Sequence, residues 1–140
     1  MTTPKFDKVG ILFSGGPAPS ANAVISSIGL NLLDNHVPVI GIMRGYEFLQ
    51  DFNKSYPKLR KDLHYGYVTR EITKARNRSG VFLRTSRANP GKDIKTMEDL
   101  NDPEKNVRLR NILDAFDYLQ IGALISIGGD DTLKTANYLW

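Results

Sequence analysis

Two short apolar runs, each closed by a pair of glycines, constrain the fold of this chain more than any other feature. "KVGILFS" (residues 8–14) is followed by Gly15 and Gly16, and "GALISIGG" (122–129) ends in Gly128 and Gly129. Apolar runs without polar alternation are typical of strands buried on both faces. Such strands occur in parallel sheets covered by helices on each side, so the runs predict an α/β fold.

The intervening segments alternate strand and helix, as this fold class requires. We predict further strands over 37–43 and 80–86, and a weaker helical segment over 67–77. A helix over 21–33 has Ser20 as its N-cap, and a second helix begins at 107. Their apolar faces hold Val24, Ile25, Ile28 and Leu32, and Leu109, Ile112, Leu113, Phe116 and Leu119. Residues 87–106 are typical of a loop.

A last helix is expected to begin near Asp131 or Thr132 and to place Leu133, Ala136, Leu139 and Trp140 toward the interior. The resulting fold class is α/β, an open, mostly parallel sheet with helices on both faces.

Composition narrows the possible partners. The 140 residues fit one domain, and their net charge of +4 suits an anionic ligand. The basic residues are dispersed and lack a recognition pattern, which argues against nucleic acid. Because the chain has no cysteine, a thiolate metal site is excluded. No apolar run is long enough to span a membrane and no signal peptide is evident, so we expect a cytoplasmic protein.

The expected topology gathers four unusual loops at one edge of the sheet, because ligands bind beyond the carboxyl ends of parallel strands. These loops are "GGPAPSAN", "RGYE", "TSRANPG" and "GGDDT". In the first, Gly15 and Gly16 expose backbone N–H groups to a phosphate at the start of a helix, whereas Pro17 and Pro19 each lack an N–H. A tight turn without a ligand is the alternative. The loop matches neither the P-loop nor the dinucleotide-binding pattern.

The "GGDDT" loop indicates a ligand-binding site more specifically than the first loop does. Gly128 and Gly129 allow a ligand close to the backbone, and Asp130 is a candidate Mg²⁺ ligand. Thr132 is placed to cap the next helix or to contact a phosphate. Helix capping would explain one aspartate but not two. In "TSR", the Arg87 guanidinium suits phosphate oxygens, although an arginine after a strand is usually a solvated surface residue.

Three ordered motifs, "GILFSGGPAPSANAVI", "GVFLRTSR" and "ISIGGDDT", resemble the phosphofructokinase family, and the doubled aspartate resembles its pyrophosphate-dependent branch. The resemblance implies that residues 1–140 are the N-terminal portion of a Rossmann-like domain that binds the phosphoryl donor. It implies that Arg87 contacts the transferred phosphoryl group, Asp130 serves Mg²⁺, and Asp131 selects pyrophosphate over ATP. It places phosphate contacts at Gly15, Gly16, Ser20, Arg87, Gly128, Gly129 and Thr132.

The implied reaction is Mg²⁺-dependent phosphoryl transfer from pyrophosphate to fructose 6-phosphate, giving fructose 1,6-bisphosphate, in a homo-oligomer. The family's catalytic base belongs to a threonine-isoleucine-aspartate motif that these residues lack. We therefore expect part of a longer enzyme, without the base segment and the sugar-phosphate domain, that does not turn over alone. An ATP-dependent phosphofructokinase and a non-catalytic phosphate-binding or regulatory subunit remain alternatives.

Three positions depart from the family pattern. Ser20, Ser79 and Arg84 stand where family members usually carry glycine. Ser20 restricts how closely a ligand can approach the first loop, although its hydroxyl adds a hydrogen-bonding group. Arg84 adds a charge near the expected site.

Overall fold

A computed structural model describes residues 6–16 and 18–140, so the predictions for Pro17 lie outside the described residues. Its sheet has the order β3-β2-β1-β4. The strands are β1 (Val9–Ser14), β2 (Val39–Ile42), β3 (Tyr65–Tyr67) and β4 (Ala123–Gly128). β1 pairs in parallel with β2 and β4, whereas β3 is antiparallel to β2. The mostly parallel sheet is therefore confirmed.

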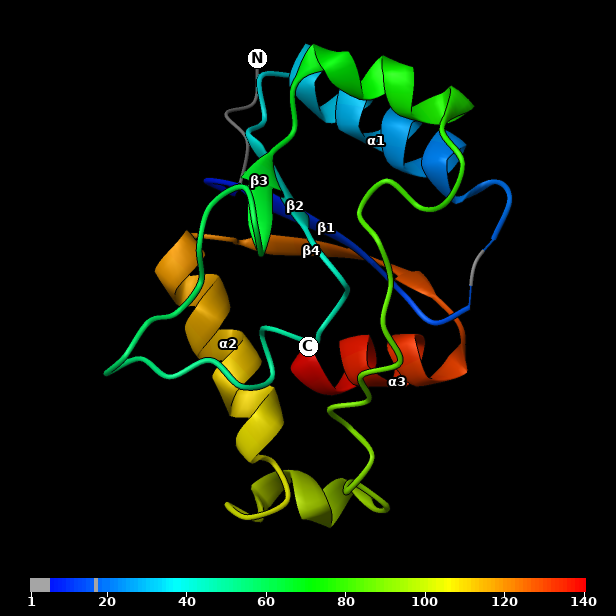
Figure 1. The fold of residues 1–140 in the computed structure, drawn as a ribbon. Coiled ribbons are helices and arrows are strands. Elements are labelled where there is room, and N and C mark those ends of the chain that lie inside the picture. Colours follow the sequence, from blue (N-terminus) through cyan, green and yellow to red (C-terminus); the bar gives the residue numbers. More distant parts are fainter. Residues whose placement is uncertain (1–5, 17) are drawn as a thin grey trace.

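Helices cover both faces of this sheet. The α-helices are α1 (Ala21–Asp34), α2 (Val107–Leu119) and α3 (Asp130–Leu139), and the 3-10 helices are η1 (Arg70–Asn77) and η2 (Met97–Asn101). α1 and η1, the green helix beside it, lie on one side of the sheet, and α2 and α3 lie on the other (Figure 1). The α/β fold class predicted from the apolar runs is thus confirmed.

Strand β1 is buried along its whole length because its side chains enter two separate cores. Ile11 and Phe13 pack with α1 and η1, whereas Leu12 packs with α2. This alternation follows from the two-residue repeat of a strand. It explains why the run is apolar at successive positions.

The buried face of α1 differs from the predicted one. Val24 is 40% exposed, and the buried positions include Ser26 and Gly29. A Cβ on Gly29 would lie 3.1 Å from Val68, so a small residue there lets the chain around η1 approach. Ser20 occupies the predicted N-cap position, but its side chain makes no capping hydrogen bond.

The buried faces of α2 and α3 also differ from the predicted ones. Leu113 of α2 is 43% exposed, while Ala115 is buried in its place. α3 buries Thr132 and Thr135, whereas Leu133 and Trp140 are exposed. The buried face of α3 is therefore more polar than the sequence pattern predicted, because its first turn packs against the polar end of β1.

The strand predicted over 80–86 is wrong. Gly80 and Arg84 adopt left-handed conformations, and the Arg84 N–H donates to the Val81 carbonyl in a turn. The buried Asn22 side chain accepts a hydrogen bond from the Phe82 N–H and donates to the Gly80 carbonyl. These contacts occupy backbone groups that a strand ladder would use. The outer position beside β2 belongs to β3 instead.

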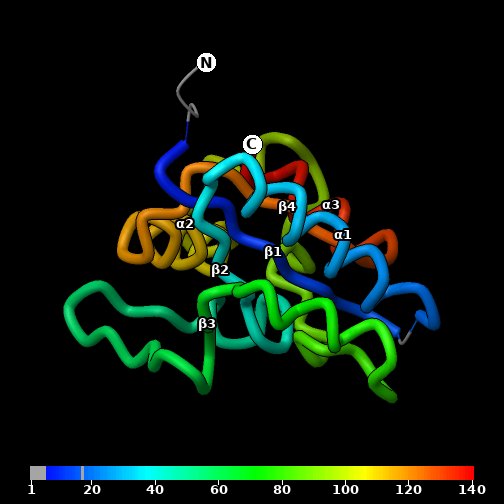
Figure 2. The backbone as a smooth tube through the Cα atoms, turned by 90° about the horizontal axis from the view of Figure 1, so that it is seen from above, coloured from blue at the N-terminus to red at the C-terminus, as the bar shows by residue number. Residues whose placement is uncertain are grey.

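The remaining connections are close to the predictions. Within 67–77 the helix begins at Arg70 and is a 3-10 helix, since Tyr67 belongs to β3. Residues 87–106 form the predicted loop except for η2. Figure 2 shows the connection between β2 and β3 extending away from the body of the molecule. Within the described residues, no helix is long and apolar enough to cross a membrane.

Candidate functional site

The carboxyl ends of β1 and β4 meet the 85–89 segment around a pocket of about 250 Å³. The parallel register pairs Ser14 with Gly128, so the loops that follow these two strands start side by side. The pocket lining brings together five residues predicted for the site: Gly15, Gly16, Arg87, Asp131 and Thr132. Ser14, Ala88 and Asn89 complete the lining.

The two glycines of the first loop have different roles. Gly15 has a φ of +105°, a conformation that favours glycine, and its N–H donates to the Ser86 carbonyl at 3.0 Å. This N–H is therefore committed to the protein. A Cβ on Gly16 would meet no atom within 4 Å, and no acceptor for the Gly16 N–H is found among the residues described. Of the two glycines, Gly16 is therefore the one with free space beside it and an N–H available to a ligand.

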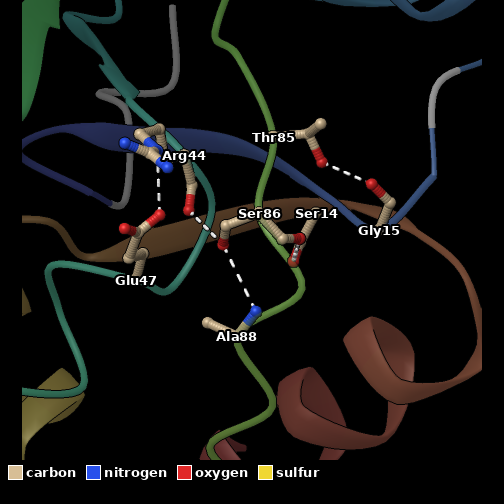
Figure 3. A network of polar contacts seen from close by, with 7 residues as sticks. All are labelled: Ser14, Gly15, Arg44, Glu47, Thr85, Ser86 and Ala88. Carbon is tan, nitrogen blue, oxygen red and sulfur yellow. Dashed lines mark hydrogen bonds and ion pairs between the residues drawn. The ribbon is translucent and has the colours of Figure 1, made fainter.

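A hydrogen-bond network joins three loops, and Ser14 and Gly15 of this network also line the pocket (Figure 3). The Ser14 hydroxyl and the Gly15 N–H both donate to the Ser86 carbonyl, at 3.2 and 3.0 Å. The Ser86 hydroxyl donates to the Arg44 carbonyl at 2.7 Å, and the Thr85 hydroxyl donates to the Gly15 carbonyl at 2.6 Å. The network fixes the "TSR" segment against the end of β1 and so delivers Arg87 to the pocket.

Arg87 and Arg84 lie in different settings although they are close in sequence. Arg87 is exposed and lines the pocket, as a phosphate-binding guanidinium must. Arg84 does not line the pocket, and its φ is +57°. The glycine expected at this position by resemblance would adopt this conformation without strain. By contrast, Ser20 has a φ of −87°, so its backbone makes no demand for glycine.

In the fourth loop, Gly128 is required by packing. A Cβ there would overlap the Ser14 carbonyl oxygen and lie 2.6 Å from the Thr132 hydroxyl. Thr132 is buried, and its hydroxyl donates to the Ser14 carbonyl at 3.2 Å. Thr132 therefore lies inside the helix and holds α3 against β1 rather than capping the helix.

The paired aspartates occupy the first turn of α3. The N-cap residue is Gly129, so neither aspartate is the capping residue. Both are exposed at the end of the helix that favours negative charge. Asp131 lines the pocket, whereas Asp130, Gly128, Gly129 and Ser20 do not. The predicted metal ligand thus lies next to the pocket and the predicted selectivity residue lies in its wall.

These aspartates fit a magnesium ion that is coordinated mainly by phosphate oxygens of a bound molecule and by water. Within the described part of the chain, no cluster of three or more potential ligands exists, and no ion pair involves Asp130 or Asp131. Mg²⁺ usually uses one or two protein carboxylates together with phosphate oxygens and water. Two unpaired carboxylates beside a pocket that suits an anion match this pattern.

Tyr46 supports the sheet close to the pocket. Its hydroxyl lies 3.0 Å from the Ser126 hydroxyl of β4. Burial raises the pKa of Tyr46 above its ordinary value, and the Ser126 hydrogen bond opposes this shift. The buried phenol is therefore neutral at physiological pH and contributes no charge to the site.

The family model for phosphofructokinase matches residues 8–140. The chain belongs to the phosphofructokinase family. This membership confirms the resemblance carried by the three motifs.

The pyrophosphate--fructose 6-phosphate 1-phosphotransferase of Thermotoga maritima is 33% identical over 94% of this chain and 27% of its own length. The enzyme of the same name from Naegleria fowleri is 33% identical, over 94% and 26%. An ATP-dependent 6-phosphofructokinase of Buchnera aphidicola is 34% identical, over 94% and 34%. The chain spans about a quarter to a third of the length of these relatives.

The fold also matches a solved phosphofructokinase. The structure of phosphofructokinase from Saccharomyces cerevisiae aligns with a TM-score of 0.70 at 19% identity, covering 95% of this chain and 15% of that one. At this identity the match establishes the fold, and it agrees with the four-stranded, mostly parallel sheet.

Sequence reasoning did not single out several residues of this phosphofructokinase-family site. Ser14, Ala88 and Asn89 line the pocket without having been predicted for it, whereas the Thr85 hydroxyl of the "TSR" motif joins that segment to Gly15. Ser14 lies within the first motif and Asn89 within the "TSRANPG" loop, and their hydrogen-bonding side chains are the only local signal. Ala88 carries none, since its place in the wall depends on the path of the 85–89 segment.

Proposed function

We propose that this chain is the N-terminal portion of the phosphoryl-donor-binding domain of a pyrophosphate-dependent phosphofructokinase. The full enzyme transfers a phosphoryl group from pyrophosphate to fructose 6-phosphate and forms fructose 1,6-bisphosphate. One observation carries the proposal. The Asp131 carboxylate lies in the same pocket wall as Gly16 and Arg87, the two groups best suited to hold a phosphate.

Each residue has a role that its position supports. The Gly16 N–H donates to a phosphate oxygen, and the Arg87 guanidinium stabilises negative charge on the transferred phosphoryl group. Asp130 would hold Mg²⁺. When bound, this ion neutralises charge on the phosphoryl donor. Thr132 contributes by fixing the start of α3 against β1.

Asp131 selects the donor by charge and volume. A carboxylate in the pocket wall repels a third phosphate and occupies space that ATP needs beyond its two terminal phosphates. Pyrophosphate has no third phosphate, ribose or base to place there. The charge repulsion therefore weakens the binding of ATP more than the binding of pyrophosphate.

Of the two alternatives, the ATP-dependent enzyme has specific support. The Buchnera aphidicola relative, named as ATP-dependent, is as similar as the relatives named for pyrophosphate, which favours ATP as the competing donor. A non-catalytic phosphate-binding or regulatory subunit would use the same pocket without transfer. Both are decided by assaying the full-length protein.

The deciding experiment compares Mg-pyrophosphate with Mg-ATP as donors to fructose 6-phosphate. We expect transfer from pyrophosphate and little from ATP in the unaltered full-length protein. Asp131→Gly should raise kcat/KM for ATP by about tenfold or more, since about 1.4 kcal/mol of repulsion corresponds to a factor of ten. Asp131→Asn removes the charge but keeps the volume, and Asp114→Asn removes an aspartate charge on α2 as the control.

The outcomes separate the candidates. Transfer from ATP alone would establish the ATP-dependent enzyme. Pyrophosphate binding without transfer would establish the regulatory subunit. If Asp131→Gly improves ATP use no more than the Asp114 control, Asp131 does not select the donor.

The proposal extends to the assembly. We propose a cytoplasmic homo-oligomer in which residues beyond these 140 supply the catalytic base and the sugar-phosphate site. The 140 residues alone should then give no transfer. Light scattering of the full-length protein, cell fractionation and a transfer assay on the isolated piece test these three points.

A further inference from the structure

We propose that Thr85 is a positioning residue that directs the Gly16 N–H into the pocket. Thr85 does not line the pocket, so it acts through the loop that does. The inference rests on the proposed function only in taking the ligand to be a phosphoryl donor. The supporting geometry consists of hydrogen bonds within this chain, which do not depend on the ligand.

One peptide group, between Gly15 and Gly16, links Thr85 to the pocket. The Thr85 hydroxyl donates to the Gly15 carbonyl at 2.6 Å, a short and partly buried hydrogen bond. The carbonyl of Gly15 and the N–H of Gly16 belong to the same peptide plane. Among the described residues no peptide is cis, and a trans peptide points its N–H opposite to its C=O. Holding the carbonyl toward Thr85 therefore turns the Gly16 N–H away from Thr85.

This peptide requires an external restraint because glycine flanks it on both sides. Neither residue has a Cβ to limit rotation, so the plane could turn at little conformational cost. The preceding peptide is already fixed, since the Gly15 N–H donates to the Ser86 carbonyl at 3.0 Å. Within the described residues, Thr85 supplies the next restraint along the chain.

Thr85 is itself well placed to act as this restraint. The adjacent Ser86 is held at its carbonyl by Ser14 and Gly15 and at its hydroxyl by Arg44 (Figure 3). The Thr85 backbone is thus anchored to the end of β1. A carbonyl that accepts a hydrogen bond also polarises its own amide, which strengthens the N–H as a donor.

The test measures donor binding in full-length variants. Thr85→Val removes the hydroxyl and keeps nearly the same shape, whereas Thr85→Ser retains the hydroxyl. Thr73→Val is the matched control, because the Thr73 hydroxyl donates to the Arg70 carbonyl at 3.1 Å on η1. Isothermal titration measures the Kd of Mg-pyrophosphate and of Mg-ATP, and steady-state assays measure the KM for fructose 6-phosphate.

We expect Thr85→Val to weaken Mg-pyrophosphate binding about tenfold, while the KM for fructose 6-phosphate changes less than twofold. Thr85→Ser and Thr73→Val should bind as the unaltered protein does. A thermal melt verifies folding, and Thr85→Ala replaces Thr85→Val if that variant is not recovered folded. A merely structural role would lower the melting temperature without separating the two ligands.

Three results would overturn the inference: unchanged pyrophosphate binding in Thr85→Val, an equal loss in Thr85→Ser, or an equal loss in Thr73→Val. If the unaltered protein binds Mg-ATP and not Mg-pyrophosphate, the proposed donor is wrong, and the same comparison is made with ATP. If it binds neither, both the proposed function and the inference are wrong.

Discussion

The loops after β1 and β4 share the sequence pattern of a strand, two glycines and a helix, yet the first glycine of each pair is required for a different physical reason. In the first loop, Gly15 is set by backbone conformation and Gly16 faces open space. In the second, Gly128 is set by close packing against Ser14 and Thr132, and Gly129 faces open space. In each pair, one glycine is needed by the protein and the other is not.

This difference shows that the two glycines of a pair have separate structural roles. Gly128 lets the ends of β1 and β4 lie close together and Gly15 adopts a left-handed conformation, whereas the second glycine of each pair leaves room beside the loop. Only Gly16 of the two open glycines lines the pocket. Ligand approach therefore depends more on the first loop, and the position of α3 depends more on the second.

The largest expected effect comes from Gly128→Ala. The added Cβ overlaps the Ser14 carbonyl oxygen and crowds the Thr132 hydroxyl, both fixed parts of the β1–α3 contact. We expect a loss of about 3 kcal/mol in the free energy of unfolding, measured by urea denaturation of the full-length protein. Gly129→Ala is the control, because its Cβ would meet nothing within 4 Å. Equal effects of the two substitutions would contradict the packing explanation.

Gly15→Ala should have the next largest effect, for a different reason. The φ of +105° strains any residue with a Cβ, and we expect a loss of about 2 kcal/mol. The free volume is sufficient, since the nearest atom would be the Gly129 nitrogen at 3.7 Å. A loss below about 0.5 kcal/mol would show that the loop changes its conformation to accommodate the Cβ.

Thr132→Val isolates the hydrogen bond that joins the two loops. Removing the hydroxyl leaves the Ser14 carbonyl without this donor, so we expect a loss of about 1 kcal/mol. Thr132→Ser keeps the hydroxyl and should retain that contribution. Urea denaturation of both variants gives the comparison, and a greater loss for the serine variant would assign the role of Thr132 to its methyl group.

Gly16→Ala should have the smallest effect on stability and a clear effect on binding. Its Cβ meets no protein atom within 4 Å, so we expect the unfolding free energy to stay the same or rise by up to about 1 kcal/mol. The methyl group would enter the pocket and weaken Mg-pyrophosphate binding. Titration calorimetry beside Gly129→Ala tests this point, and unaltered binding would remove Gly16 from the phosphate site.

The elements that could be predicted from sequence are those with a strong local pattern. β1, β4 and the three α-helices follow from apolar runs, periodicity and glycine stops. The strand expected at 80–86 failed because its backbone groups bond to Asn22, which is 58 to 60 residues away. The apolar residues of that run are compatible with either outcome, so no local signal could decide it.

The candidate site shows the same division. Motif reasoning selected Arg87, Asp131 and both glycines of the first loop, and the structure brings them to one pocket. It did not show that the Gly15 N–H is already committed to Ser86, or that Thr132 binds Ser14. Both contacts join segments far apart in the chain.

The sequence by itself determined the fold class, the family and the loops that form the site, because apolar periodicity and glycine placement are local properties. Only the tertiary structure decided which N–H groups, hydroxyls and carboxylates of those loops remain available to a ligand. A hydrogen-bonding group is available only when no neighbour in space has taken it. That neighbour is chosen by how the strands and loops pack, as Ser86 is for Gly15.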